Sequence, residues 1–361
     1  MSEIASGYLV GFFFWLSISF GCLGILMIQH LTGGHWGFGI RRPLESAAKT
    51  LPLMLVLFIP IVLLSHDIYP WAHDVEAAQL GDKAKYYLNM PFFTGRAVGY
   101  FLLWTAMAFI LSKWSIEQDK TNSVDSAIDV AQKCRNISGP GILICALTIT
   151  LASFDWIMSL DPHWYSTIFG ILTIGGCLLN SFAFMIIILS QIGNREGMKG
   201  YIGSKHFHDL GKLLLACVML WGYFNLSQLL IIWSGNLPEE TIWFIRRRSG
   251  GWQYVGPALI ALHFAVPFFL LLSRALKKKP TILASVAGFL MVMRLVDLFW
   301  LIQPQFNGGV IAPMAVVSTI VSVGVIGAIW LGLFFKFLSG NPLLPVRDPY
   351  IQKEAIVHGN H

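Results

Sequence analysis

Long apolar runs with few charged side chains limit most strongly what this chain can fold into. The run LPLMLVLFIPIVLL, residues 51–64, is typical, and nine such stretches approach or exceed the roughly 20 apolar residues that cross the core of a bilayer. Only 12% of the 361 residues are charged, against about 25% in an average soluble domain. The sequence therefore predicts a polytopic membrane protein, all-α because backbone groups in lipid must bond within their own segment. We place its spans at about residues 7–31, 47–65, 96–112, 139–160, 165–191, 212–234, 253–274, 280–303 and 310–335.

Lysine and arginine are unevenly distributed over the loops between these spans. With successive loops assigned to alternate sides, eighteen fall on one side and six on the other. The positive-inside rule makes the crowded side cytoplasmic, so we expect the N-terminus and the segment SHDIYPW outside and the C-terminus inside. This asymmetry accounts for the net charge of +6 without a nucleic-acid partner. The run Arg246, Arg247 and Arg248 opposes the trend.

The fourth and eighth spans end in similar strings, which points to an internal repeat. Asp155 in FDWIMSLDPHW and Asp297 in RLVDLFWLIQPQF are each followed by a proline seven residues later. We expect two four-helix bundles, residues 47–192 and 193–338, that run parallel in the membrane because their offset of four helices is even. Residues 1–46 would add an extra N-terminal helix with a cytoplasmic loop, and residues 339–361 a cytoplasmic tail. Chance similarity between apolar strings is the alternative.

Three charged side chains, Asp155, Arg294 and Asp297, lie within the apolar cores of the predicted spans. Each costs about 2.5–3.5 kcal/mol at the centre of a membrane helix, so we expect each to face the bundle interior and to have a partner. Arg294 and Asp297 can pair on one helix, whereas the partner of Asp155 must come from another helix. Structural ion pairing and proton transfer both stay open, because buried carboxylates in membrane proteins are also the usual relay groups.

Histidine and cysteine add few candidates for a site. His66 and Asp67 lie at the outer end of the second span, where they either anchor the helix end or exchange protons with water. His263 lies deep in the seventh span, and an interhelical hydrogen bond would explain it without a proton path. The five cysteines form no CxxC or CxxCH motif, so we expect no haem, iron–sulfur cluster or metal ion in this chain.

The inner loop over residues 113–138 also carries a helical signal. Apolar residues recur on one face of SVDSAIDVAQ, at Val124, Ala127, Ile128 and Ala131. This spacing predicts a short helix lying on the membrane surface.

Several strings resemble those of a known family. They are HDIYPWA after the second span, LASFDWIMSLDPHWYST at residues 151–167, and NPLLPVRDP near the C-terminus. Together with the two four-helix units, they resemble the smaller polysulfide-reductase-like (NrfD-like, ActF-type) membrane subunit of bacterial alternative complex III, a quinol:cytochrome c oxidoreductase. The resemblance covers nearly the whole chain. Members of this family commonly have ten membrane helices, so nine spans with the N-terminus outside would correspond to the absence of the first one.

The resemblance implies a multi-pass subunit of the bacterial inner membrane with no redox group of its own. Its partners would be an iron–sulfur subunit, a multihaem cytochrome c, a larger NrfD-like (ActC-type) subunit and small membrane subunits, and these would carry the haem c and the iron–sulfur clusters. Quinol oxidation would belong to the larger NrfD-like subunit. Proton transfer and assembly would remain for this chain, with a quinone or a bound lipid as its ligand.

The candidate proton-transfer residues have two origins. The resemblance points to Asp155 and to the pair His66 and Asp67. The physical arguments above add Arg294, Asp297 and His263. The alternatives are a secondary transporter of a small solute, which would need broken helices and a polar site near the bilayer centre, and a purely structural membrane anchor.

Overall fold

The computed structural model describes residues 2–73, 79–121, 123–195 and 198–345, and in this part of the chain all regular structure is helical. The longer helices are α1 (Ser2–Thr32), α2 (Arg41–Ala48), α3 (Leu51–Leu63), α7 (Met90–Asp119), α8 (Val124–Trp156), α9 (Phe169–Ile192), α10 (Ser204–Gly235), α11 (Pro238–Ile245), α12 (Trp252–Leu259), α13 (Val266–Leu272), α15 (Pro280–Ile302) and α16 (Pro313–Ser339). Shorter helices are α4 (Ser65–Ile68), α6 (Asp82–Tyr86) and α14 (Arg274–Lys277). The remaining segments are η1 (His35–Ile40), η2 (Pro70–Ala72), η3 (Met158–Leu160), η4 (Arg246–Arg248), η5 (Ile260–Ala265), η6 (Gln303–Gln305) and η7 (Asn307–Gly309). The predicted C-terminal tail lies outside the described residues from residue 346 onward.

Nine helical segments within the described ranges are long and apolar enough to cross a membrane. They are Ser2–Thr32, His35–Leu63, Met90–Asp119, Val124–Leu160, Phe169–Ile192, Ser204–Gly235, Trp252–Leu272, Pro280–Gln305 and Pro313–Ser339. Each one overlaps a predicted span, so the all-α polytopic fold is confirmed. Most of these segments are longer than the predicted spans, because the helices continue into the polar residues that flank the apolar runs.

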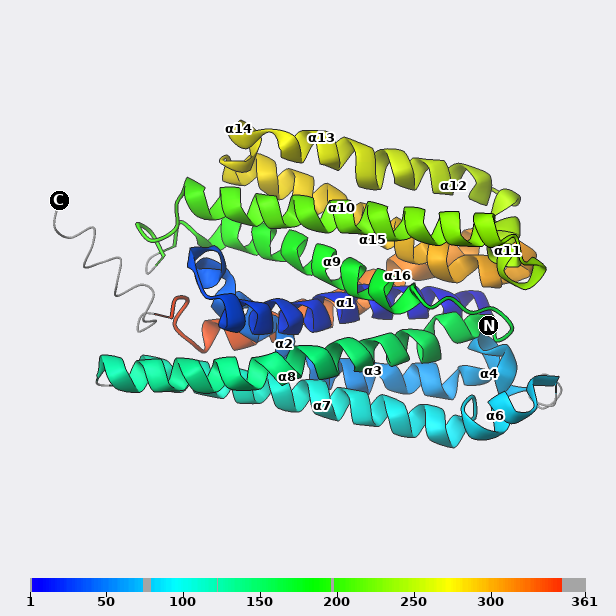
Figure 1. Ribbon diagram of the computed structural model, residues 1–361, viewed down its shortest axis with the longest axis horizontal. Helices are drawn as coiled ribbons and strands as arrows, with labels where there is room; N and C mark the ends of the chain where they lie inside the picture. Colours follow the sequence, from blue (N-terminus) through cyan, green and yellow to red (C-terminus); the bar gives the residue numbers. More distant parts are fainter. Residues whose placement is uncertain (1, 74–78, 122, 196–197, 346–361) are drawn as a thin grey trace.

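The third and fourth spans form a long helical hairpin (Figure 1), with 30 residues in α7 and 33 in α8. Ser123 caps α8 by accepting a hydrogen bond from the backbone N–H of Ser126 at 3.2 Å, and the helix then continues unbroken to Trp156. Residues 124–131 are therefore helical as predicted, but they begin α8, and the expectation of a separate short helix on the membrane surface is wrong. The apolar face of residues 124–131 belongs to the first turns of α8, which is part of the membrane-length segment Val124–Leu160.

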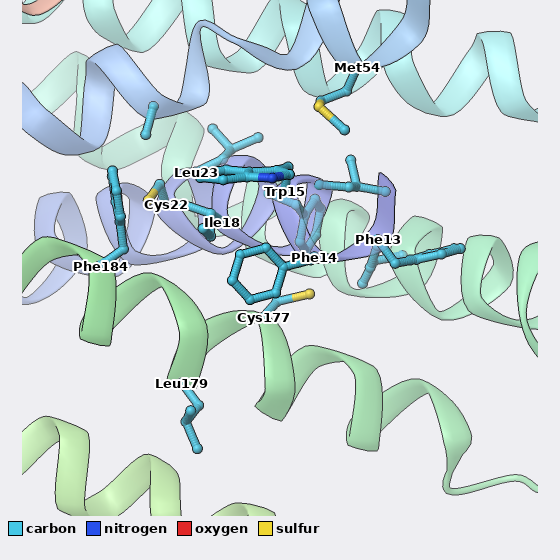
Figure 2. Close-up of a cluster of buried hydrophobic side chains, with 14 of the residues drawn as sticks. Phe13, Phe14, Trp15, Ile18, Cys22, Leu23, Met54, Cys177, Leu179 and Phe184 are labelled. Carbon is cyan, nitrogen blue, oxygen red and sulfur yellow. The ribbon is translucent and has the colours of Figure 1, made fainter. Parts of the chain in front are cut away.

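α1 is the central helix of the bundle. Of its most apolar stretch 94% is buried inside the protein, which fits a helix that is apolar on all sides. It packs against α3, α8 and α9 from the first predicted bundle and against α15 and α16 from the second. Figure 2 shows Trp15 and Ile18 of this helix between Met54 of α3 and Cys177 of α9. The helix predicted as an addition to two bundles is thus the one against which both pack.

The contact between α1 and α9 is close enough to require a glycine. A Cβ atom on Gly21 would lie 2.3 Å from the carbonyl oxygen of Cys177 and 2.7 Å from its carbonyl carbon. These are backbone atoms, which cannot move aside without shifting the helix. Small residues allow this approach between membrane helices.

α1 and α9 lie between two groups of helices (Figure 1). On one side are α3, α7 and α8, and on the other are α10, α12, α13 and α15. The two groups come from the two predicted repeats, whose boundaries stay a prediction.

The second membrane-length segment begins earlier than the sequence indicated. Residues 41–48 form α2, and all eight are buried, although residues 41–46 were predicted to belong to a cytoplasmic loop. η1 and α2 lead into α3, so this segment extends from His35 to Leu63. The charged residues of RRPLESAA concealed the helix, and their burial is explained by partners that are described below.

The two ends of the bundle carry different loops (Figure 1). The N-terminus, α4, α6 and α11 lie at one end, which we call the α11 end. The turn between α7 and α8 lies with α14 at the opposite end, which we call the α14 end. This arrangement agrees with the predicted alternation of loops, while which end faces outward stays a prediction.

The seventh span is not a regular α-helix. α12 changes at Ile260 into the π-helix η5, and the α-helix resumes as α13 at Val266. Pro257 lies inside α12 and Pro267 in the first turn of α13. π-helical turns occur frequently at functional sites, and this one contains His263.

Candidate functional site

Asp297 is the centre of a buried polar cluster. Its Oδ2 accepts a hydrogen bond from Nη1 of Arg294, which lies one turn earlier on α15, and another at 3.1 Å from the indole Nε1 of Trp221 on α10. The side chains of Arg294 and Asp297 are at most 3% exposed. The predicted pairing on one helix is confirmed, and Trp221 adds a neutral donor from a second helix.

His263 joins this cluster through Trp221. The centroids of the two rings lie 4.3 Å apart, with their planes tilted by 33°, and His263 is fully buried. Neither of its ring nitrogens has a hydrogen-bond partner among the described residues. The interhelical hydrogen bond expected of a core histidine is therefore not formed. A buried polar group without a partner is costly.

A glycine of α9 makes room for the Arg294 guanidinium. A Cβ atom on Gly176 would lie 2.2 Å from Nη2 of Arg294 and 2.3 Å from its Cζ. The string IGGC in α9 thus lets the cation enter the contact between α9 and α15, beside Asp297.

A cavity of about 850 Å³ adjoins Asp297 between α10, α11, α12 and α15. Its wall is mainly aliphatic and aromatic, and its volume lies within the range of ligand sites. Its polar lining residues other than Asp297 include Asn225, Gln228, Arg247, Arg248 and Gln253. The lining residues Tyr223, Leu226 and Ile260 are each more than half exposed. The cavity therefore opens sideways, between α10 and α12, toward the face of the bundle that would meet lipid.

Asp155 has its own ion pair in the other half of the bundle. Arg96 on α7 donates to both carboxylate oxygens, from Nη2 at 2.8 Å and from Nε at 2.9 Å. The hydroxyl of Tyr100 donates to Oδ2 at 3.3 Å. Asp155 is fully buried, whereas 19% of the Arg96 side chain is exposed. As expected, the partner of Asp155 comes from another helix.

Tyr87 completes the surroundings of Arg96. The guanidinium carbon lies 4.0 Å from the centroid of the Tyr87 ring, and Nη1 donates to the Tyr87 carbonyl oxygen at 3.1 Å. Burial and the nearby Asp155 carboxylate raise the pKa of Tyr87, so its phenol stays neutral at physiological pH. Arg96 and Asp155 are then the charged members of this cluster.

His66 and Asp67 lie in α4 at the α11 end, and both are exposed. The His66 carbonyl oxygen lies 2.8 Å from Nε2 of His73, and the two imidazole rings are 5.4 Å apart. Tyr69 is buried beneath them and donates to the carbonyl oxygen of Trp156 at 3.1 Å. In the part of the chain that the structure describes, no hydrogen bond or ion pair joins His66 or Asp67 to Asp155, so these candidates do not form one site.

Arg246 connects the two halves at the α11 end. Its Nη1 donates to Oδ2 of Asp161, in the connection between α8 and α9, at 2.6 Å and also to the side chain of Gln305. Close by, the rings of Trp164 and Trp243 stack with centroids 4.2 Å apart. These contacts hold α11 and η4 against the first half of the chain.

A further buried ionic network lies around α2. Arg42 pairs with Glu45 at 2.7 Å and with Asp119 of α7, and donates to the Ser115 carbonyl oxygen at 3.1 Å. Arg42 and Glu45 are at most 2% exposed, and Arg41 donates to the side chain of Gln29 on α1 at 3.1 Å. The network gives the charged residues of α2 partners inside the bundle.

Arg96 was not among the predicted site residues, because it is the first residue of the third predicted span and was counted with the charges at the outer side. The helix start was nevertheless encoded, because Asn89 accepts a hydrogen bond from the backbone N–H of Phe92 at 3.1 Å and Pro91 occupies the first turn. Asparagine at the cap followed by proline is a known helix-start signal. It would have extended α7 by two turns and placed Arg96 within the membrane helix rather than at its start.

The described residues contain no group of three or more His, Cys, Asp or Glu side chains that could hold a metal ion. The absence of haem, iron–sulfur clusters and metal from the complete chain stays a prediction. In comparisons with known proteins, no family model and no curated sequence matches this chain.

Proposed function

We propose that this chain is an integral membrane subunit of a respiratory quinol:cytochrome c oxidoreductase of the alternative complex III type, in which it transfers protons and supports assembly. The observation that carries the proton-transfer role is the Asp297 cluster. The Asp297 carboxylate is buried among membrane helices and forms an ion pair with Arg294. It also lines a cavity that opens out of the bundle. Intramembrane ionisable groups in such positions are functional candidates by default.

In the proposed transfer, Asp297 alternates between two states. While ionised, it is stabilised by Arg294 and by the Trp221 indole. Protonation from the cavity side weakens the pair, and the freed Arg294 cation favours return of the proton to water. His263 lies against Trp221 with both ring nitrogens unpartnered and gives the proton a second acceptor. Asp155 with Arg96 is a comparable station in the other half, and His66 with Asp67 exchanges protons at the surface.

The assembly role rests on the contacts at the α11 end. Arg246 ties the second half of the chain to Asp161 in the first, and it gives this end a fixed shape for the haem-bearing and iron–sulfur subunits. In this proposal the chain lies in a bacterial inner membrane with the α11 end outside. Its larger NrfD-like partner and the small membrane subunits pack along its lipid-facing helices. Electrons pass through the partners, and this chain contributes no redox step.

A secondary transporter is the second candidate. It is favoured by the π-helix η5 in the seventh span, which borders the 850 Å³ cavity together with α12, since transporters bind their substrates at interrupted helices. A purely structural anchor is supported by the pairing of Asp155 and Asp297 with neighbouring cations.

Isolation of the chain from its own membranes tests the proposed function. A C-terminal affinity tag should recover it with a multihaem cytochrome c and an iron–sulfur protein, and the eluate should reduce cytochrome c with quinol. Recovery of the chain alone, from membranes that retain quinol:cytochrome c activity in the unbound fraction, would contradict membership of the complex. A transporter would instead take up solute in vesicles that contain only this chain.

A further inference from the structure

The run Arg246, Arg247 and Arg248 is the feature that the proposed function explains least. It lies at the end of the bundle that the rest of the sequence leaves poor in positive charge. Arg246 is accounted for by its contacts with Asp161 and Gln305. Among the described residues no carboxylate lies within ion-pair distance of Arg247 or Arg248. Two cations therefore meet at the mouth of one cavity without a matching anion.

Arg247 is held in a fixed orientation at this mouth. Its guanidinium lies 3.4 Å from the centroid of the Trp243 ring and 4.8 Å from that of Trp300. It donates to the carbonyl oxygens of Trp243 at 2.8 Å, of Leu301 at 3.0 Å and of Trp300 at 3.2 Å. Burial and the adjacent Arg246 lower the pKa of Arg247 well below its ordinary value. Of its five N–H donors, three are used in this way.

Arg248 is exposed and lines the same cavity as Arg247. The rest of the lining is mainly apolar and aromatic, with Asn225, Gln228, Gln253 and Asp297 as its polar members. It extends along the seventh span from Trp252 to Phe264, which at 1.5 Å per residue is about 18 Å. This depth is close to the thickness of one leaflet, about half of the 30 Å bilayer core. The site thus has two cations at headgroup level and an apolar slot of leaflet depth with a side opening to lipid.

We propose that this cavity binds an anionic phospholipid, with an acyl chain between α10 and α12 and the headgroup phosphate on Arg247 and Arg248. Arginine is the side chain best suited to a phosphate, because its fork of N–H groups can donate two parallel hydrogen bonds. Basic pockets between membrane helices are known anionic-lipid sites. A neutral amphiphile such as a quinone would fill the slot but would leave both cations uncompensated.

The proposal goes beyond proton transfer, and its readout requires no electron flow. The delipidated full-length chain is titrated with phosphatidylglycerol or with phosphatidylcholine of the same acyl chains, and bound lipid is counted by native mass spectrometry. Both lipids carry the phosphate, but the choline group of phosphatidylcholine adds a cation beside Arg247 and Arg248. We therefore expect phosphatidylglycerol, which has no such cation, to bind about tenfold more tightly. Equal affinities for the two lipids would overturn the proposal.

Three variants assign this preference to the cavity. Arg248→Gln should abolish it, whereas Lys85→Gln should retain it, because Lys85 is an exposed cation at the same end that does not line the cavity. Gly256→Leu should weaken the binding of both lipids alike, because Gly256 lines the cavity and a larger side chain there would fill part of it. The protein itself has room for the substitution, since a Cβ atom at this position would meet only Nε1 of Trp300, at 3.9 Å. A preference that survives in Arg248→Gln would overturn the proposal. So would displacement of bound phosphatidylglycerol by an equal concentration of quinone, or a partner-subunit carboxylate cross-linked to position 248 in the intact complex.

Discussion

Loss of Arg96 should destabilise the protein more than loss of the negative charge on its partner Asp155. The pair is bidentate, and Asp155 is fully buried, whereas 19% of the Arg96 side chain is exposed. Arg96→Gln therefore leaves a charge without a partner in a dry site, which costs about 3–5 kcal/mol, and we expect the lower end because Arg96 is partly solvated. Asp155→Asn leaves a cation that reaches water, so we expect a loss of about 1–2 kcal/mol.

The double variant Arg96→Gln with Asp155→Asn removes both charges and keeps two side chains that can hydrogen-bond. We expect it to lose about as much as Asp155→Asn alone, which corresponds to a coupling of about 3 kcal/mol between the two positions. Lys113→Gln is a matched control, since Lys113 lies 3.9 Å from Glu117 with both side chains well exposed. A surface pair of this kind is worth less than about 1 kcal/mol.

Unfolding of these variants in detergent can be followed with a thiol-reactive fluorophore. All five cysteines are buried in the folded protein, so they react when the bundle opens. A denaturant titration of each variant converts the order of stabilities into free energies of unfolding. Equal losses from the two single changes, with the double variant losing their sum, would refute the buried pair.

Three further predictions concern packing, pH and topology. Gly21→Ala should lower the free energy of unfolding by about 1–3 kcal/mol, because the new Cβ meets the Cys177 backbone. Gly24→Ala should be nearly neutral, because the atom nearest to its Cβ would be 3.8 Å away. Equal melting temperatures of the two variants would contradict this prediction. Burial, together with Lys212, lowers the pKa of Lys277 below the unfolded value of about 10.4, so its charged form destabilises the folded protein. Lys277→Met should therefore stabilise the folded protein at pH 7. The gain in melting temperature should shrink as the pH rises through the lowered pKa toward 10.4, and a gain that grows with pH would contradict the prediction. An impermeant maleimide should label Asp82→Cys in intact cells but Lys278→Cys only after permeabilisation, and the reverse pattern would invert the assigned orientation.

Apolar run length predicted the nine spans because a membrane helix must satisfy its backbone internally and cover the hydrocarbon with apolar side chains. Apolar run length did not predict the parts of these helices that contain charged residues. Arg96 in α7 is partly exposed and the Arg42 to Glu45 segment of α2 is buried, and both have partners from other parts of the bundle. Such charged residues are assigned to loops when each helix is considered alone, because their partners lie on other helices.

The site was predictable to the extent that its contacts are local. Arg294 and Asp297 are three residues apart on one helix, and their pairing follows from helix geometry. The contact of Trp221 with Asp297 depends on the rotation and depth of α10 relative to α15, which no helix specifies by itself. The cavity beside them has the same origin, because it exists only where several helices fail to meet.

The proton-to-electron ratio of the assembled complex tests the central claim most directly. Arg294→Gln with Asp297→Asn removes both charges of the Asp297 cluster, so that neither is left buried without its partner. Asp209→Asn, in a partly exposed pair with Lys212, is the control. The complexes are reconstituted into vesicles, and proton release per electron is measured beside quinol oxidation in the presence of an uncoupler. We expect the double variant to release fewer protons per electron while uncoupled quinol oxidation persists, and the control to match the wild type. A double variant that assembles normally and keeps the wild-type ratio would show that Asp297 and Arg294 are structural and that protons do not pass through this cluster.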